Sequence, residues 1–105
     1  MHQQKKRIIS LIKENIREVD PKAEVVLFGS RARGDERKDS DWDLLILTEY
    51  PVSFKVEQQF RHHLFDLELE LGEAFSTFVY SKIDWEMKHS VTPLYQNVSK
   101  EGIRI

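Results

Sequence analysis

The chain has 105 residues, a formal net charge of −2 and an apolar content of 40%. This length suffices for one domain, residues 1–105, and the apolar content is typical of a globular protein. The balance of acids and bases gives no basic footprint, so nucleic acid is not expected as a direct ligand. The sequence contains no cysteine, which excludes disulfides, thiol catalysis and thiolate metal sites.

The first ten residues, MHQQKKRIIS, are basic but have neither a long apolar core nor a small-residue cleavage site. No stretch approaches the ~18 apolar residues that a membrane span requires. We therefore expect a cytoplasmic protein with no membrane association.

The first half of the chain predicts a helix, a strand and a loop. Apolar residues at helical spacing indicate a helix over 8–19, which ends before Pro21 because the residue before proline avoids helical backbone. The apolar, β-branched run 23–28 indicates a buried strand that ends at Gly29. Residues 31–40 are polar and contain a glycine, so we expect a loop there.

A second strand is expected over residues 42–47, WDLLIL. Because successive side chains of a strand point to opposite faces, Asp41 and Asp43 share one face. Trp42 and Leu44 share the other face. Two same-face positions lie ~7 Å apart along the backbone, which is close enough for two carboxylates to converge on one divalent cation.

The segment 56–71 carries an apolar helical stripe that closes at Gly72, but its last part, 65–71, also alternates strictly. We expect a helix, because the stripe spans the whole segment and because Leu and Glu favour helix. A strand over 65–71 is the alternative. A third strand is expected over 75–80, which is rich in aromatic and β-branched residues.

The last quarter of the chain predicts two short helices and an edge strand. One helix is expected over 83–88, and another begins after Thr92, with Pro93 at its first position, and ends at Gly102. Residues 103–105 are expected to add the edge strand. The order α-β-β-α-β-α-α predicts an α/β (α+β) fold, a small mixed β-sheet backed by helices.

The acid pair at the start of the second strand suits a metal. Magnesium prefers oxygen ligands, and it is often held by one or two carboxylates and shared with substrate phosphates. A cation between Asp41 and Asp43 would offset the repulsion of their like charges. Taken alone, the pattern also fits a turn-capping Asp41 followed by a solvated Asp43.

Small and basic residues follow the first strand directly. Gly29 lets a bulky anion approach the backbone, and the hydroxyl of Ser30 can donate a further hydrogen bond. The guanidinium groups of Arg31 and Arg33 suit phosphate. Taken alone, this stretch also fits a plain turn with solvated arginines.

The whole block GSRARGDERKDSDWDLLIL, residues 29–47, resembles the polymerase β-like nucleotidyltransferase superfamily and its minimal nucleotidyltransferase (MNT) domains. The shared pattern is a strand, Gly-Ser, a loop of about this length, and then two acids separated by an apolar residue. The residues that match position by position are Gly29, Ser30, Asp41 and Asp43, and those that fit the local form are Arg31, Arg33, Gly34, Ser40 and 44–46.

The resemblance implies a nucleotidyltransferase fold, ATP or another nucleoside triphosphate as substrate, and Mg²⁺ as cofactor. It implies that Asp41 and Asp43 bind the metal and carry catalysis. The implied nucleotide-binding residues are Gly29, Ser30, Arg31, Arg33 and Ser40. Standalone domains of this kind are commonly antitoxins of helical HEPN toxins, which implies transfer of AMP to a toxin tyrosine as the means of blocking its RNase site.

One expected residue is missing. Active members of the superfamily carry a third carboxylate on the following strand, whereas residues 74–80 (AFSTFVY) contain no acid and Ser76 takes the third position. Transfer is then slow or absent with nucleotide binding retained, or the acceptor or a partner supplies the base. If 65–71 is the strand, Asp66 or Glu68 supplies the missing ligand.

The leading hypothesis is a nucleotidyltransferase that moves a nucleoside monophosphate, AMP from Mg-ATP, to a protein acceptor, as antitoxin to a HEPN toxin. The alternative is a catalytically degenerate module of the same fold that neutralises its partner by contact. A plain α/β structural domain is the third hypothesis.

Overall fold

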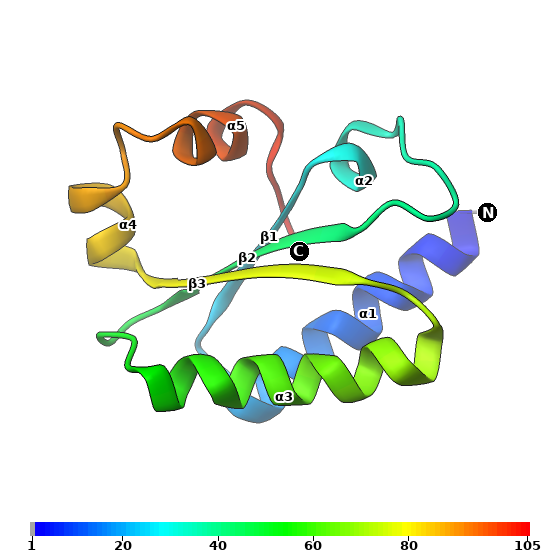
Figure 1. Ribbon diagram of the computed structural model, residues 1–105, viewed down its shortest axis with the longest axis horizontal. Coiled ribbons are helices and arrows are strands. Elements are labelled where there is room, and N and C mark those ends of the chain that lie inside the picture. The colour runs from blue at the N-terminus through cyan, green and yellow to red at the C-terminus, as the bar shows by residue number, and fades with distance from the viewer. Residues whose placement is uncertain (1) are drawn as a thin grey trace.

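The computed structural model describes residues 2–105 and shows a four-stranded sheet with helices on both sides (Figure 1). The strands are β1 (Glu24–Phe28), β2 (Trp42–Thr48), β3 (Phe75–Ser81) and β4 (Ile103–Arg104). The helices are α1 (His2–Val19), α2 (Ser30–Arg33), α3 (Phe54–Leu71), α4 (Lys82–Lys88) and α5 (Pro93–Glu101). The expected α/β class is confirmed. Among residues 2–105, no helix has the length and apolar run needed to cross a bilayer.

The sheet is mixed, with the strand order β3-β2-β1-β4. β1 pairs antiparallel with β2 and with β4, whereas β2 and β3 are parallel. A parallel pair needs a long crossover, and α3 supplies it. The register sets Phe28 of β1 and Ser76 of β3 on either side of Asp43. The end of β1 and the starts of β2 and β3 therefore lie side by side at Asp43.

The ambiguous stretch 65–71 is helical, because it forms the last part of α3. Ser53 caps the start of this helix, where its side chain accepts a hydrogen bond from the amide of Val56, and Gly72, with a φ of 68°, caps its end. Asp66 and Glu68 therefore lie on a helix and not on a strand beside the acid pair. The strand alternative is wrong, and so is the suggestion that one of these two residues supplies the third carboxylate.

The expected loop over 31–40 is wrong at its start, where α2 forms one helical turn. The carbonyl of Gly29 accepts hydrogen bonds from the amides of Ala32 and Arg33, each at 3.0 Å. Gly34 ends the turn with a φ of 86°, and its amide donates to the carbonyl of Ser30 at 2.9 Å. A turn of four residues between two glycines is too short to produce a periodic apolar pattern, which is why the sequence indicated a loop.

The first helix also starts earlier than its apolar stripe, at His2 instead of residue 8. Lys and Gln fill residues 3–6, and both favour helix without marking a buried face. The additional turns of α1 bring Lys5 into contact with α2. The ammonium of Lys5 donates a hydrogen bond to the carbonyl of Arg31 at 2.6 Å.

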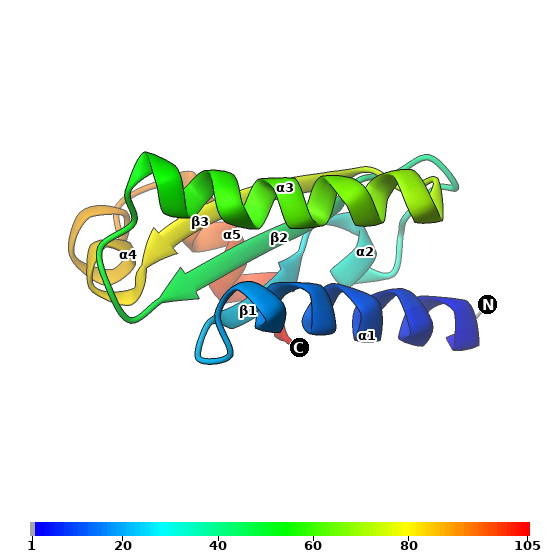
Figure 2. The same cartoon turned by 90° about the horizontal axis from the view of Figure 1, so that it is seen from below.

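The core has two layers, one on each face of the sheet, and β2 is buried between them. On the side seen in Figure 2, α1 and α3 pack against alternate side chains of β2, from Trp42 to Ile46. On the other side Leu45 and Leu47 pack with side chains from β1, α4 and α5. Because strand side chains alternate, Asp43 lies on this second side. Asp43 therefore lies in line with Leu45 and Leu47, near the start of a strand whose other side chains are buried.

Gly102 joins α5 to β4 at a crowded point. A Cβ added there would lie 2.5 Å from the carbonyl oxygen of Val98 and 2.8 Å from Cγ1 of Val26. Gly102→Ala should therefore lower the free energy of unfolding by about 1–3 kcal/mol, the usual cost of overpacking. Urea unfolding measures this effect, with Ser99→Ala on the exposed side of α5 as the control. A change within ~0.5 kcal/mol, as at ordinary surface positions, would contradict the crowding.

Candidate functional site

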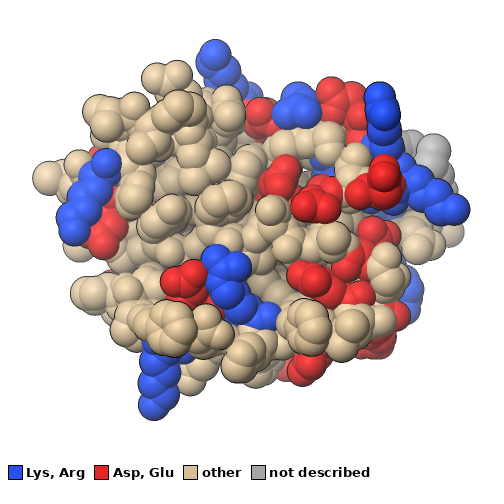
Figure 3. All heavy atoms as spheres, in the orientation of Figure 1, with Lys and Arg blue, Asp and Glu red and all other residues tan. Residues whose placement is uncertain are grey.

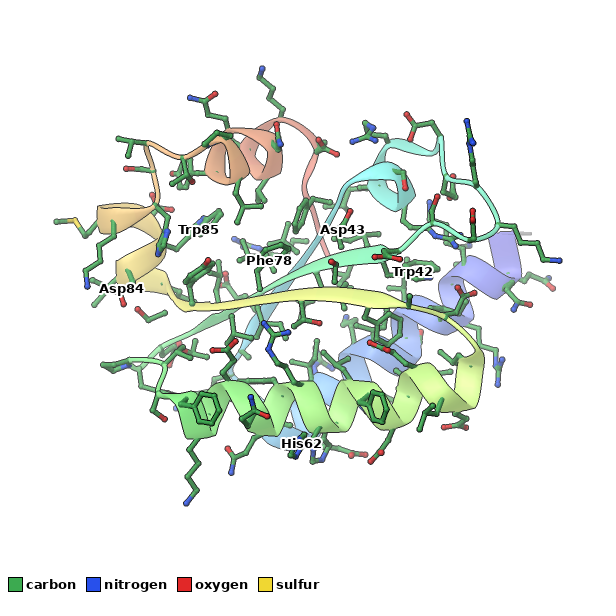
Figure 4. All side chains as sticks on the ribbon, in the orientation of Figure 1. Trp42, Asp43, His62, Phe78, Asp84 and Trp85 are labelled. Atoms are coloured by element: carbon green, nitrogen blue, oxygen red, sulfur yellow. The ribbon has the colours of Figure 1, made fainter. Side chains whose placement is uncertain are left out.

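The two acids of the pair lie together at the start of β2. Asp43 is in the strand, and Asp41 precedes it by two residues, outside the strand and exposed. Partial burial, followed by the charges of Asp41 and Glu101, raises the pKa of the Asp43 carboxyl. Figure 4 shows Asp43 on the side of the sheet that carries Phe78 and Trp85, beneath α2 and α5. Asp41 is close enough for its charge to affect the pKa of Asp43, and joint metal binding by the two carboxylates stays a prediction.

The turn after β1 lies directly against one of these carboxylates. Gly29 has a φ of 75°, which favours glycine, and an added Cβ would overlap Oδ2 of Asp43. The register explains the contact, because Phe28 is paired with Asp43 and Gly29 is the next residue. Ser30 then starts α2 at the same place. The glycine-serine turn (Gly29 and Ser30) and the acid pair (Asp41 and Asp43) thus lie side by side, and we call them the two walls of the candidate site.

Arg33 is on the side of the acid pair. Its guanidinium forms ion pairs with Glu101 at 2.7 Å and with Asp35 at 3.2 Å. Its positive charge offsets a small part of the rise in the pKa of Asp43. The Arg33 side chain remains 47% exposed. An exposed guanidinium beside the turn is available to an anionic ligand if it leaves one of these carboxylates.

Glu101 is a site residue that the sequence analysis missed. It is the last residue of α5, and it lies close enough to influence the pKa of Asp43. The only signal in the sequence is the following Gly102, which brings the end of α5 against β1. The approach of two segments far apart in the chain could not be seen without the fold.

Arg31 and Ser40 occupy the opposite side of the loop. The guanidinium of Arg31 lies 4.7 Å from the centre of the Trp42 ring and donates to the carbonyl of Ser40 at 2.9 Å. The hydroxyl of Ser40 accepts a hydrogen bond from the amide of Arg37 at 2.8 Å. Of the five residues that the sequence suggested for nucleotide binding, Gly29, Ser30 and Arg33 are thus beside the acid pair. Arg31 and Ser40 instead form hydrogen bonds within the loop that precedes Asp41.

The structure has a serine where a third acid was expected. The register pairs Ser76 with Asp43, and strand alternation puts both side chains on the same face. Among the side chains of residues 3–105, no group of three or more His, Asp or Glu is arranged to hold a metal ion. The two carboxylates present still fit magnesium, which is commonly bound through one or two carboxylates, with water and phosphate oxygens as its other ligands.

Charge is distributed unevenly over the face shown in Figure 3. Acidic side chains gather around α2 and the starts of β2 and β3, whereas the part over α4 and α5 is mostly uncharged. A triphosphate approaching the acid pair would be repelled, since like charges there are only partly neutralised by Arg33. The site therefore suits an anionic ligand that arrives with a divalent cation.

Comparisons with known proteins agree with this geometry. The family model of the nucleotidyltransferase domain matches residues 9–102. The sequence matches no curated protein at a significant level.

Several solved structures share the fold. One is a toxin–antitoxin with AMP-PNP, with 21% identity, a TM-score of 0.67, and coverage of 90% of this chain and 69% of that chain. A variant of the MntA–HpeT toxin–antitoxin has 19% identity and a TM-score of 0.60, covering 95% and 70%. A complex of a tri-AMPylated Shewanella oneidensis HEPN toxin with an MNT antitoxin has 20% identity and a TM-score of 0.55, covering 99% and 71%.

At these identities the solved structures establish the fold, while the family match extends over most of the chain and includes both walls of the site. The protein therefore belongs to the nucleotidyltransferase domain family.

Proposed function

We propose that this protein transfers AMP from Mg-ATP to a protein acceptor, and that the acceptor is a HEPN toxin for which it is the cytoplasmic antitoxin. The observation that carries the proposal is the contact between the Gly29 turn and the Asp43 carboxylate. In a nucleotidyl transfer, the phosphates and the metal have to be held side by side. A turn that can bind phosphate and a carboxylate pair that can bind a cation meet here with no side chain between them.

Each residue then has a role in the proposed reaction. The backbone at Gly29 and the hydroxyl of Ser30 hold the β- and γ-phosphates, and Arg33 steadies the phosphate charge. Asp41 and Asp43 hold Mg²⁺. When bound, this ion would neutralise charge that develops on the transferred group and on the leaving pyrophosphate.

The transfer itself is a substitution at the α-phosphorus of ATP. The acceptor hydroxyl oxygen forms the new P–O bond, the bond to the β-phosphate bridge breaks, and pyrophosphate leaves with that electron pair. The hydroxyl proton passes to water or to a base of the acceptor, because Ser76 stands where a carboxylate would take it. General base catalysis typically contributes about 10²–10⁴-fold, so we expect slow transfer.

Similarity to solved structures supports the choice of substrate and acceptor. One relative by fold was crystallised with AMP-PNP, and another complex contains a tri-AMPylated HEPN toxin with an MNT antitoxin. These names describe those proteins, and for this chain both the nucleotide and the toxin are part of the proposal.

A second candidate function is a binding module that neutralises its partner by contact without transferring AMP. It is favoured by the serine at the third position and by the lack, in the side chains described from residue 3 onward, of a group of three residues able to hold a metal ion. The two functions differ in whether ATP changes the partner covalently.

The first prediction concerns label transfer. With α-labelled ATP, Mg²⁺ and the product of the neighbouring gene tested as the proposed toxin, the wild type should label that product. Asp41→Asn and Asp43→Asn should each reduce the rate about 100-fold or more, because metal-assisted charge stabilisation is worth several kcal/mol. Asp66→Asn, the same chemical change on the exposed side of α3, is the control and should retain the rate. A tight complex without label would reject transfer and support the binding module.

The second prediction compares two of the three glycines that have positive φ. Gly29 and Gly34 both have positive φ, but only at Gly29 would a Cβ meet Asp43, whereas nothing lies within 4 Å at Gly34. Both alanine variants should lose about 1–3 kcal/mol of stability from backbone strain. Only Gly29→Ala should also weaken Mg-ATP binding, by at least about tenfold, since a 1.4 kcal/mol perturbation of the site is enough. Isothermal titration calorimetry measures the affinities, and equal losses for both variants would contradict the assignment.

The third prediction concerns charge at Asp43. Its raised pKa means that the metal-free fold disfavours the ionised form, so this group makes stability fall as pH rises from 3.8 through the raised value. Asp43→Asn should therefore raise the melting temperature at neutral pH in EDTA. The advantage should vanish below pH 3.8, where the carboxyl is protonated in both folded and unfolded chains.

Adding Mg²⁺ should then raise the melting temperature of the wild type but not of Asp43→Asn. Differential scanning calorimetry measures both effects. A variant that melts below the wild type in EDTA at neutral pH would show that the carboxylate stabilises the fold, contrary to this prediction.

A further inference from the structure

Arg31 contacts a backbone carbonyl, an aromatic ring and a carboxylate, whereas Arg33 pairs with carboxylates. Its Nη2 donates to the carbonyl of Ser40 at 2.9 Å, and Nε lies 3.3 Å from the same oxygen. The guanidinium also packs on the Trp42 ring and lies 3.6 Å from the carboxylate of Glu73. The side chain is only 12% exposed, compared with 47% for Arg33.

These contacts place the Arg31 guanidinium behind the acid pair. Trp42 is buried in the core layer formed with α1 and α3, and its indole nitrogen lies within 3.4 Å of the same Glu73 oxygen. Strand alternation directs Asp43 to the face opposite Trp42, and Asp41 lies just before the strand. A triphosphate bound at the acid pair could be reached by Arg31 only if the contacts to Ser40, Trp42 and Glu73 were broken.

The same contacts connect the two walls of the site. Arg31 follows Ser30 in α2, while its side chain holds the carbonyl of Ser40, the residue before Asp41. Its own carbonyl is held by Lys5 of α1 at 2.6 Å. The distance between the glycine-serine turn and the first acid is therefore fixed by one side chain that spans the loop between them.

We infer that Arg31 is a positioning residue, which fixes Asp41 relative to Ser30 and does not bind the triphosphate. The inference rests on the proposed function, since it concerns how that metal and nucleotide site is kept in register. The two arginines then have different roles. Arg33 contacts the triphosphate, and Arg31 holds the loop between Ser30 and Asp41.

The affinity for a metal alone distinguishes positioning from phosphate binding. Removing a positive charge near a cation site should tighten cation binding, or leave it unchanged, if charge is the only effect. If Arg31 positions Asp41, its loss should instead weaken cation binding, even without nucleotide. Mn²⁺ is a suitable probe because it takes the same oxygen ligands and its free concentration can be followed by electron paramagnetic resonance.

The experiment compares the full chain with Arg31→Met, Arg31→Lys and Arg61→Met. Arg31→Lys keeps the charge but cannot both stack on Trp42 and hold the Ser40 carbonyl. Arg61 is the matched control, because its guanidinium also contacts a backbone carbonyl, that of Thr77, and a carboxylate, that of Glu57, away from the site. For each protein we would measure Mn²⁺ affinity, Mg-ATP affinity, the melting temperature and amide hydrogen exchange over 38–41.

Positioning predicts that both Arg31 variants bind Mn²⁺ about 10- to 100-fold more weakly, the range seen when supporting residues around a metal are lost. It also predicts faster exchange over 38–41. Arg61→Met should retain Mn²⁺ affinity even if its melting temperature falls. Unchanged or tighter Mn²⁺ binding by Arg31→Met, together with weaker Mg-ATP binding, would overturn the inference and make Arg31 a phosphate ligand.

Failure of the proposed function gives a different result. If the wild type binds neither Mn²⁺ nor Mg-ATP, the proposed function is rejected, and exchange alone decides the inference. In that case, faster exchange over 38–41 in Arg31→Lys but not in Arg61→Met supports the positioning of this loop by Arg31, and unchanged exchange overturns it. If Arg31→Met does not fold, Arg31→Lys gives the comparison, because it keeps the charge and most of the side chain.

Discussion

The structure depends on one close contact, between the backbone of Gly29 and the carboxylate of Asp43. The antiparallel register of β1 and β2 brings these residues together, since Phe28 pairs with Asp43. A side chain at position 29 would displace the carboxylate or the turn. Glycine is therefore required at position 29 for two reasons, its positive φ and its lack of a Cβ. Both allow the Asp43 carboxylate to lie directly against the turn after β1.

This contact has an electrostatic cost in the metal-free protein. β2 is buried on both faces, and Asp43 continues its apolar row with Asp41 and Glu101 nearby. The raised pKa of Asp43 expresses that cost, and Arg33 offsets part of it. Functional sites often retain such unfavourable charge, because a ligand of opposite charge then binds with greater gain. Both faces of β2 thus pack a core layer, and the face that carries Leu45 and Leu47 also carries the charged Asp43 at its start.

Much of this arrangement could be predicted from the sequence where the signal was local. The strands over 23–28 and 42–47 were marked by apolar runs, and the Gly-Ser and acid-pair spacing indicated the family. The helical stripe correctly favoured helix over 65–71, although strict alternation suggested a strand. Periodicity over the whole segment was the better guide because Phe60 and Leu64, within the same stripe, are buried.

The sequence could not reveal what depends on short turns or on distant segments. The single turn of α2 is too brief to show a period, and it is this turn that sends Arg31 and Arg33 to opposite sides. Two arginines two positions apart therefore look equivalent in the sequence and differ in the fold. Glu101 reaches the site only because the end of α5 closes on β1, across a separation of 58 residues from Asp43, as the two residue numbers show.

The short span from Gly29 to Asp43 has a consequence for folding and for divergence. Both walls belong to one connection between neighbouring antiparallel strands, so closing the loop that joins them costs little chain entropy. The contact between Gly29 and Asp43 therefore requires only the pairing of β1 with β2. Elsewhere the chain needs only to supply an apolar core of suitable volume, which many sequences can do. The solved structures described above share the fold at 19–21% identity, which agrees with this freedom.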